Sequence, residues 1–218
     1  MTSQTLLIDR FFLPAALSAE SQEAVGVRMQ FAAGEEIYAQ GEQAEFVYRL
    51  VSGAVRTTRL LADGRRQIGD FYYPGDVFGL DTAESHRFSA EGLGDCQVQV
   101  LKRQAPSRSV EDRARFDRMI WAATSRELDR AQDHILLLAR MTACEKVASF
   151  LLGIADRLKA ELTILPMSRQ DMADYLGLTI ETISRMLSRL QADGLVEFLG
   201  CRHFRIRHRS GLDRLAVS

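Results

Sequence analysis

Residues 168–187, SRQDMADYLGLTIETISRML, are the stretch that decides the fold of this chain. Ser168 followed three residues later by Asp171 makes a capping-box pattern, so a first helix is expected to begin after Ser168. Gly177 permits a sharp turn that a residue with a Cβ would resist, and Thr179 is suited to cap a second helix. Two short helices joined by a turn containing Gly are typical of a helix-turn-helix.

The spacing of small and apolar residues predicts that the two helices pack closely. Ala173 is small where the second helix, Ile180 to about Ala192, crosses the first, and Ile183 fills the angle between them. Any small helical domain can match this spacing by chance. A helical domain without a DNA-binding role is therefore the alternative.

Five polar residues of the second helix share the side that faces away from this contact: Glu181, Ser184, Arg185, Ser188 and Arg189. The N-terminal part of such a helix enters the major groove of DNA. Arg185 can donate to guanine O6 and N7, Glu181 can accept from cytosine N4, and Ser184 is small enough to meet a thymine methyl group. We expect these three to read bases, and Ser188 and Arg189 to contact the DNA backbone. A solvated face stabilised by a Glu181–Arg185 pair at i,i+4 is the alternative.

A hairpin with a basic second strand is expected next, formed by LVEFL and HFRIRHR. Alternation predicts that Phe204 and Ile206 face inward while Arg205 and Arg207 face outward. With Arg202 in its turn, such a wing would hold DNA phosphates, which positions a protein without specifying sequence.

Cys201 lies beside Arg202 in this predicted turn. Neighbouring cations favour a thiolate, and oxidation would place bulk or negative charge near DNA phosphate. A redox switch at Cys201 is therefore a hypothesis, and an incidental turn cysteine is the simpler interpretation. DNA binding that is unchanged by peroxide, and then by Cys201→Ser, would contradict the switch.

The first half of the chain has the pattern of short β-strands. From about residue 31 to 105, runs such as FVYRLVSG, AVRTTRLL and QVQVLKR are separated by turn residues. Asp63-Gly64 lies between two such runs and indicates a two-residue hairpin. Regular short strands predict an all-β roll or barrel. Residues 1–30 are expected to be weakly structured or helical.

A long amphipathic helix is predicted at about residues 108–140, followed by a core helix at about 142–160. The long helix has small and apolar residues in the a/d pattern by which two helices pair. That row consists of Trp121, Thr124, Leu128, Ala131, Ile135 and Leu138. We expect it to join two copies of the chain in a homodimer; packing of the helix on its own β-domain is the alternative.

Composition and charge fit a globular protein of two domains. The chain has 218 residues, of which 46% are hydrophobic and 26% charged, and a net charge of -1. Residues 106–218 carry 18 Lys or Arg against 15 Asp or Glu, whereas residues 1–105 carry 10 against 14. The chain has neither the run of about eighteen apolar residues that spans a membrane nor a signal-peptide pattern, which predicts a cytoplasmic protein without a membrane partner.

The residue pattern predicts no metal site and no enzyme. The cysteines Cys96, Cys144 and Cys201 lack the CxxC or Cys/His spacing of a zinc site. A cupin-like metal enzyme needs clustered His and carboxylate ligands, but His86 is the only His in the β-region. No Ser-His-Asp order, P-loop or dinucleotide glycine pattern occurs either.

The order of these segments resembles that of the CRP/FNR family of transcription regulators over nearly the whole chain. The motifs that carry the resemblance are GEEIYAQGE, YRLVSGAVR, DGRRQIGDFYYPGDVFG, HILLLAR and SRQDMADYLGLTIETISRML. It implies an α+β protein with an N-terminal β-roll like a cyclic-nucleotide-binding domain, a long dimerisation helix and a C-terminal winged helix-turn-helix. We expect these parts at residues 1–107, 108–140 and 141–218. The resemblance also implies an activator that recruits RNA polymerase.

Within the family, the second helix is similar to that of the FNR and FixK branch. Glu181, Ser184 and Arg185 match its E-x-x-S-R motif, which implies binding to a palindrome of double-stranded DNA like TTGAT-N4-ATCAA. The positions that contact phosphates in relatives are occupied here by Arg169, Gln170, Thr179 and Thr182.

Two known effector sites of the family are incomplete in this chain. FNR holds an iron–sulfur cluster through an N-terminal cysteine group, and residues 1–30 contain no Cys. In cAMP-binding relatives a Gly-Glu pair and an Arg-Ser pair hold the cyclic phosphate. Here Gly79 is followed by Leu80 instead of Glu, and Arg87 is followed by Phe88 instead of Ser. Arg87 and Ser89 together are an alternative anion site.

His86, expected in an exposed loop, is a candidate haem ligand, although an exposed His is more often solvated. A FixK-like regulator without a cofactor or an obligatory small-molecule effector is the interpretation that fits these departures. A sensor gated by cyclic nucleotide or haem is the alternative.

Overall fold

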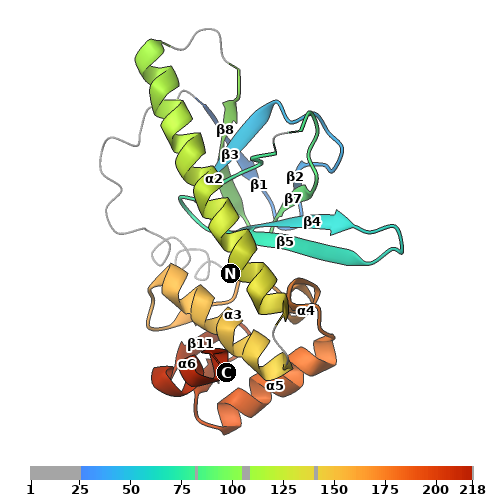
Figure 1. Ribbon diagram of the computed structural model, residues 1–218, viewed down its shortest axis with the longest axis vertical. Helices are drawn as coiled ribbons and strands as arrows, with labels where there is room; N and C mark the ends of the chain where they lie inside the picture. The colour runs from blue at the N-terminus through green and yellow to red at the C-terminus, as the bar shows by residue number, and fades with distance from the viewer. Residues whose placement is uncertain (1–25, 82, 105–108, 140–141, 218) are drawn as a thin grey trace, which may run out of the picture. The chain divides into compact units, whose positions relative to one another are not determined.

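The computed structural model describes residues 26–81, 83–104, 109–139 and 142–217. These form two compact units, one ending at Leu128 and the other beginning at Asp129 (Figure 1). The α+β class predicted from the sequence is confirmed, with a β-roll, a long helix and a winged helix-turn-helix in chain order. The boundaries of the three predicted parts stay a prediction.

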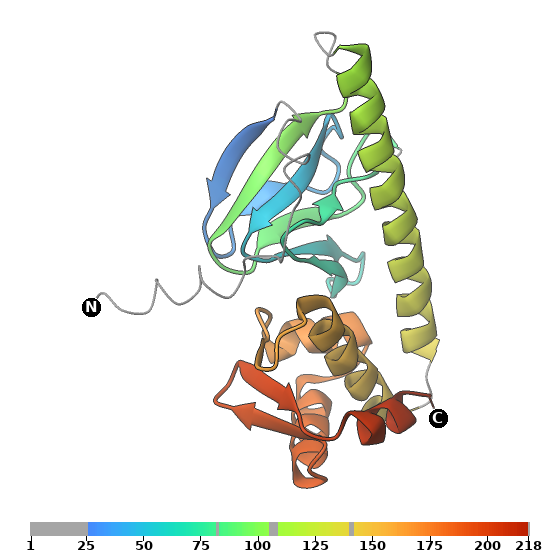
Figure 2. The same ribbon diagram turned by 90° about the vertical axis from the view of Figure 1, so that its left-hand side faces the viewer.

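The first unit contains two four-stranded antiparallel sheets in its described part, and Figure 2 shows them facing each other. One sheet has the order β1-β8-β3-β6, made by Val27–Phe31, Cys96–Lys102, Phe46–Ser52 and Val77–Phe78. The other has the order β2-β7-β4-β5, made by Glu36–Tyr38, Ser89–Gly92, Val55–Leu60 and Arg66–Tyr72.

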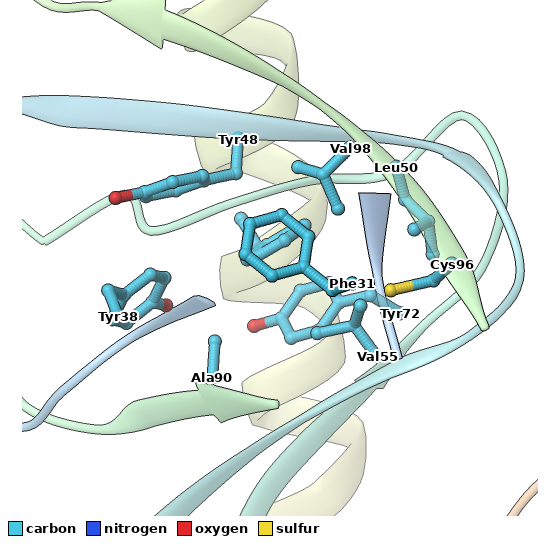
Figure 3. Close-up of a cluster of buried hydrophobic side chains, with 10 residues drawn as sticks. Phe31, Tyr38, Tyr48, Leu50, Val55, Tyr72, Ala90, Cys96 and Val98 are labelled. Carbon is cyan, nitrogen blue, oxygen red and sulfur yellow. The ribbon is translucent and has the colours of Figure 1, made fainter. Parts of the chain in front are cut away.

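The space between these sheets is filled by side chains of both. In β4, Val55 and Thr57 are buried while the residues between and after them are not, as expected for a strand with one face toward a core. Aromatic residues dominate this core, and Figure 3 shows Phe31, Tyr38 and Tyr72 converging in it. The full cluster is Phe31, Tyr38, Tyr48, Leu50, Val55, Tyr72, Phe78, Ala90, Cys96 and Val98.

Three details of the roll differ from the prediction. β1 begins at Val27 in a segment expected to be weakly structured or helical, and β7 was not expected at all. Four of the five β1 residues are exposed, so the strand shows no alternation, and its position comes from pairing with β8. The β4–β5 hairpin is confirmed. Its connection is longer than the expected two residues, because the last bond across it joins the Leu61 N–H to Arg65 O and leaves three residues, 62–64, in the turn. The earlier part of residues 1–30 lies outside the described residues.

The long helix α2, Val110–Ala139, confirms the predicted helix. Ser109 precedes it, and its Oγ accepts from Asp112 N–H at 3.1 Å. The helix buries Phe116 and Ala123, and Figure 2 shows it running along one side of the roll. Those two residues pack against Val47, Val77 and Leu101.

The second unit has helices α3, α4, α5 and α6 and a small sheet. The helices are Ala143–Leu158, Arg169–Leu176, Ile180–Ala192 and Arg209–Val217. The sheet has the order β10-β11-β9, made by Val196–Leu199, His203–Ile206 and Thr163–Ile164. The core helix expected at about 142–160 is confirmed, whereas α6 was not predicted. None of the described helices has the length and apolar character needed to cross a membrane.

Gly53 and Gly64 form a matched pair that tests the close packing of the roll. Both have positive φ, +85° and +83°, but a Cβ at Gly53 would lie 2.7 Å from Cys96 Cα, whereas one at Gly64 would meet nothing within 4 Å. We expect Gly64→Ala to lower the free energy of unfolding by about 1 kcal/mol, from backbone strain alone. Gly53→Ala should cost roughly 2–4 kcal/mol because overpacking is added to the strain. Denaturant unfolding measures both, and equal losses would contradict the tight approach.

Candidate nucleic-acid interface

The start of α4 is fixed by the predicted capping box. Ser168 Oγ accepts from the Asp171 N–H at 3.1 Å, and Asp171 Oδ2 accepts from the Ser168 N–H at 2.9 Å. Asp171 is only 2% exposed, so its carboxylate is held at the helix start. Such reciprocal bonds satisfy two helix N–H groups and set Arg169 as the first helical residue.

The turn between α4 and α5 also follows the prediction. Gly177 has a φ of +64° and ends α4, and the Leu178 N–H bonds to Ala173 O at 3.0 Å. Thr179 Oγ1 accepts from the Thr182 N–H at 3.3 Å, which caps α5. A glycine in this left-handed conformation lets the chain reverse within three residues.

The packing of α5 on α4 decides which α5 side chains face solvent. Ala173 and Ile183 are completely buried. Leu187 and Leu190 of α5 are buried as well, 4% and 0% exposed. On the other face the residues Glu181, Arg185, Ser188 and Arg189 are exposed, and Thr182 and Ser184 are half-buried.

Two arginines hydrogen-bond to hydroxyl groups of α5. Arg169 Nη1 on α4 donates to Ser184 Oγ at 3.2 Å, which brings these two predicted residues together. Arg185 Nη2 donates to Thr182 Oγ1 at 3.3 Å. In the described part of the chain no Glu181–Arg185 ion pair forms within 4 Å, although the charge of Arg185 still acts on the Glu181 carboxylate.

Glu181 is ionised at neutral pH. The pKa of its carboxyl is lowered because the carboxylate accepts from its own backbone N–H, then from the Thr179 hydroxyl, with a smaller contribution from the charge of Arg185. An ionised carboxylate only accepts hydrogen bonds. Glu181 is thus suited to a donor such as the cytosine amino group.

Of the other residues predicted to contact the backbone, two have bonds within their own helix. Gln170 Nε2 donates to Asp174 Oδ1 at 2.7 Å, and Arg189 Nε lies 3.8 Å from Asp193 Oδ2. These side chains are exposed, and exposed pairs of this kind contribute little stability. Exchanging such a partner for a phosphate oxygen therefore costs little.

The wing is the predicted hairpin, but the expected outward arginines are paired. Phe204 is completely buried and faces inward as predicted, while Ile206 is half-buried. Glu197 lies opposite Arg205 in the β10–β11 register, and its Oε2 is 3.0 Å from Arg205 Nε and 2.7 Å from Arg207 Nη2. One carboxylate thus neutralises much of the charge expected to meet DNA phosphate.

Two contacts of the wing were missed in the sequence. Glu197 could have been found from the hairpin register, because residues directly opposite on antiparallel strands interact. Gln191 Oε1 on α5 accepts from the Phe198 N–H at 3.1 Å and ties the wing to α5. The turn residues Cys201 and Arg202 are exposed, and the redox switch at Cys201 stays a prediction.

The predicted pairing row of α2 is exposed, and its members in the first unit, Trp121, Thr124 and Leu128, do not pack on the roll. Trp121, Leu128 and Ile135 are 78%, 59% and 66% exposed, and Thr124, Ala131 and Leu138 are exposed too. The apolar residues of α2 that pack against the roll are instead Phe116, Met119, Ile120 and Ala123. Packing on its own β-domain therefore does not explain the row.

The segment Gly79–Ser89 of the roll corrects the expectation for His86. The side chain is 2% exposed rather than in an exposed loop, and its Nδ1 lies 2.9 Å from Asp81 Oδ2. Ser89 Oγ accepts from the Gln40 N–H at 2.9 Å, so its hydroxyl already binds backbone. Arg87 is exposed. In the alternative Arg87–Ser89 anion site, the Ser89 hydroxyl is therefore already hydrogen-bonded to backbone, and the Arg87 side chain is exposed to solvent.

Two family models match the chain. Residues 145–215 match the Crp-like helix-turn-helix domain, and residues 28–111 match the cyclic nucleotide-binding domain. The first match covers α4, α5 and the wing, and the second covers the roll.

Known proteins and solved structures are similar over most of the chain. The nitrogen fixation regulation protein FixK of Azorhizobium caulinodans is 44% identical over 208 residues, which are 92% of this chain and 84% of that protein. The transcriptional activatory protein AadR of Rhodopseudomonas palustris is 40% identical over 182 residues, 81% of this chain and 76% of that protein. The solved structure of FixK2 from Bradyrhizobium japonicum has a TM-score of 0.82 and 47% identity, and covers 89% of this chain and 98% of that one.

Glu197→Gln tests whether ion pairing withholds the wing arginines from DNA. We expect tighter binding to any duplex and a salt dependence of log K that is steeper by about one unit for each additional phosphate that the wing neutralises. Fluorescence anisotropy over a salt series measures both. Glu84→Gln removes the same charge from an exposed residue of the first unit and should change neither. An unaltered salt slope in Glu197→Gln would mean that Arg205 and Arg207 do not reach phosphate.

Proposed function

Because the chain belongs to the CRP/FNR family of transcription regulators, in its FixK branch, we propose that it is a homodimeric activator that reads a TTGAT-N4-ATCAA-like palindrome. We also propose that its DNA binding has no obligatory small-molecule effector. The observation that carries the proposal is the outward face of α5. Glu181 is ionised there. One turn away, Arg185 bonds to the Thr182 hydroxyl and not to a carboxylate of the described residues.

Base reading is assigned to Glu181, Ser184 and Arg185. Arg185 forms a bidentate pair with guanine, which requires only that it exchange the Thr182 hydroxyl for the base edge. Glu181 accepts from cytosine N4, and Ser184 meets a thymine methyl group or base edge. These three residues lie in the N-terminal half of α5, the part of a recognition helix that enters the major groove.

Phosphate contacts hold the helix in the groove. Arg169 and Gln170 lie in the first turn of α4, where helix N–H groups and the helix dipole also favour an anion. Arg202 lies in the exposed turn of the wing. The other residues assigned to phosphates are Thr179, Thr182, Ser188 and Arg189. Their contribution is the same for every sequence, so they supply affinity and not selectivity.

The exposed row of α2 supplies the dimer interface. Large apolar side chains so exposed at heptad spacing are unusual on a monomer and are typical of a helix that pairs with a copy of itself. A dimer related by a two-fold axis presents two recognition helices about 34 Å apart, one for each half of a palindrome. Bound beside a promoter, such a dimer would recruit RNA polymerase.

Effector independence is supported by the filled interior of the roll. The space between the sheets holds ten buried core residues, five of them aromatic. The His86 ring is buried against this core, and the Ser89 hydroxyl accepts from the Gln40 N–H. A sensor gated by a cyclic nucleotide or haem would have to displace these contacts first.

Arg185→Ala tests base reading. We expect a loss of about 1–3 kcal/mol per half-site on the palindrome and little further loss when the guanine of TTGAT is replaced. Fluorescence anisotropy with both duplexes measures this. Arg189→Ala, a change one turn further along α5, should weaken binding to the two duplexes equally. If Arg185→Ala bound the palindrome as tightly as the wild type, its assignment to a base would be wrong.

Ile135→Asp tests the interface, with Leu136→Asp as its matched control. The two side chains are similarly exposed, 66% and 64%, but only Ile135 lies in the predicted row. Ile135→Asp would bury two unpaired carboxylates, so we expect dimerisation to weaken on the order of 100-fold. Sedimentation velocity over a concentration series measures the dissociation constant. Equal weakening by both substitutions would place the interface elsewhere on α2.

A further inference from the structure

His86 lies in the connection between β6 and β7, yet its ring is inside the roll. The imidazole stacks on Tyr38, with ring centroids 3.8 Å apart and an interplanar angle of 21°, and lies 6.2 Å from the Tyr48 ring. The backbone is held on both sides, because the His86 N–H bonds to Glu42 O and the Gly41 N–H bonds to His86 O, each at 2.8 Å. The ring is thus inserted from a firmly anchored residue.

Asp81 holds one edge of the ring. Burial acts to raise the pKa of this carboxyl, but hydrogen bonds from His86 and the Arg87 N–H, with the charges of His86 and Arg103, outweigh burial and lower the pKa. The carboxylate is therefore ionised and can only accept, so Nδ1 of His86 carries the proton of the 2.9 Å bond. The orientation of the imidazole is fixed by this bond.

The other edge of the ring has no partner. Among the described residues, Nε2 of His86 is buried without a hydrogen bond. An imidazole whose second nitrogen is left unpaired in a core is unfavourable as simple packing.

The stack continues from His86 to the long helix. Tyr38 lies 6.2 Å from Phe78, and Phe78 lies 5.1 Å from Tyr72, between ring centroids. Tyr72 Oη then donates to Glu127 Oε1 on α2 at 2.9 Å. Glu127 immediately precedes Leu128 of the pairing row. In Figure 3, Tyr38 and Tyr72 point into the same space, with α2 behind them.

We propose that the His86 imidazole is a built-in ligand of the β-roll, which fills a site for a small planar heterocycle and holds α2 through Tyr38, Phe78 and Tyr72. The inference rests on the proposed function and deepens it, because a site occupied by the chain's own ring needs no separate effector. Removal of the ring leaves an aromatic cavity with an ionised carboxylate at one edge. Such a cavity takes up a small molecule that matches it in shape and donor.

The test is chemical rescue of His86→Ala with imidazole. We expect the variant to bind the palindrome at least about tenfold more weakly than the wild type, within the usual range of coupling between sites. Millimolar imidazole should restore the affinity along a saturating curve and raise the Tm of the variant, with no effect on the wild type. Oxazole has the same size and shape but no N–H to donate to Asp81, and should rescue less.

Two outcomes with the alanine variant would overturn the proposal. Unaltered DNA binding by His86→Ala would mean that the ring controls nothing, and a Tm raised by imidazole without restored DNA binding would mean that the ring only stabilises the roll. Failure of the wild type to bind the palindrome would instead contradict the proposed function, and the rise in Tm of His86→Ala with imidazole would still report the site.

Tyr72→Phe tests whether the aromatic rings connect His86 to α2, and it removes no ring. It is also the variant to use if His86→Ala fails to fold. It deletes only the hydroxyl that reaches Glu127. We expect weaker DNA binding that imidazole does not restore. Binding equal to that of the wild type would overturn the proposed path from His86 to α2.

Discussion

The contact of α4 with α5 is the constraint on which the DNA-binding unit depends. Ala173 and Ile183 are both fully buried there, and Gly177 reverses the chain in a left-handed conformation between them. A larger residue at Ala173 would push the helices apart, and α5 would turn a different face outward. The positions of Glu181 and Arg185 therefore follow from apolar packing and backbone geometry, since neither side chain contributes to the contact that orients it.

The helix α2 likewise has different residues for its contact with the roll and for its exposed row. Its inward residues, chiefly Phe116 and Ala123, are buried against the roll, while the row that includes Trp121 and Leu128 is left in solvent. A helix with apolar residues on two faces satisfies one face within its own chain and needs a second partner for the other. Glu127 connects the two roles, because it receives a hydrogen bond from the roll at the residue before Leu128.

Local signals in the sequence predicted the helix-turn-helix in detail, and long-range contacts account for what was missed. Ser168, Gly177 and Thr179 act within three or four residues of themselves, so their caps and turn can be predicted without a structure. The burial of His86 depends on Asp81, Glu42 and Tyr38 together, a combination that no local pattern reveals. β1 has no alternation, and the pairing of Glu197 with two arginines depends on hairpin register. The roles of the interface residues toward DNA stay predictions.

As a FixK-type regulator, this chain is expected to recognise its palindrome with no ligand but its own side chains. The most direct measurement is fluorescence anisotropy of a labelled TTGAT-N4-ATCAA duplex with purified protein, in air and without added ligand. The controls are a palindrome of TGTGA, the half-site of the cAMP-binding branch of the family, and a scrambled duplex. We predict tight, selective binding to the first duplex and a steep loss of affinity as salt rises. Binding to none of the three, or binding that requires cAMP, would contradict recognition of the palindrome without an effector.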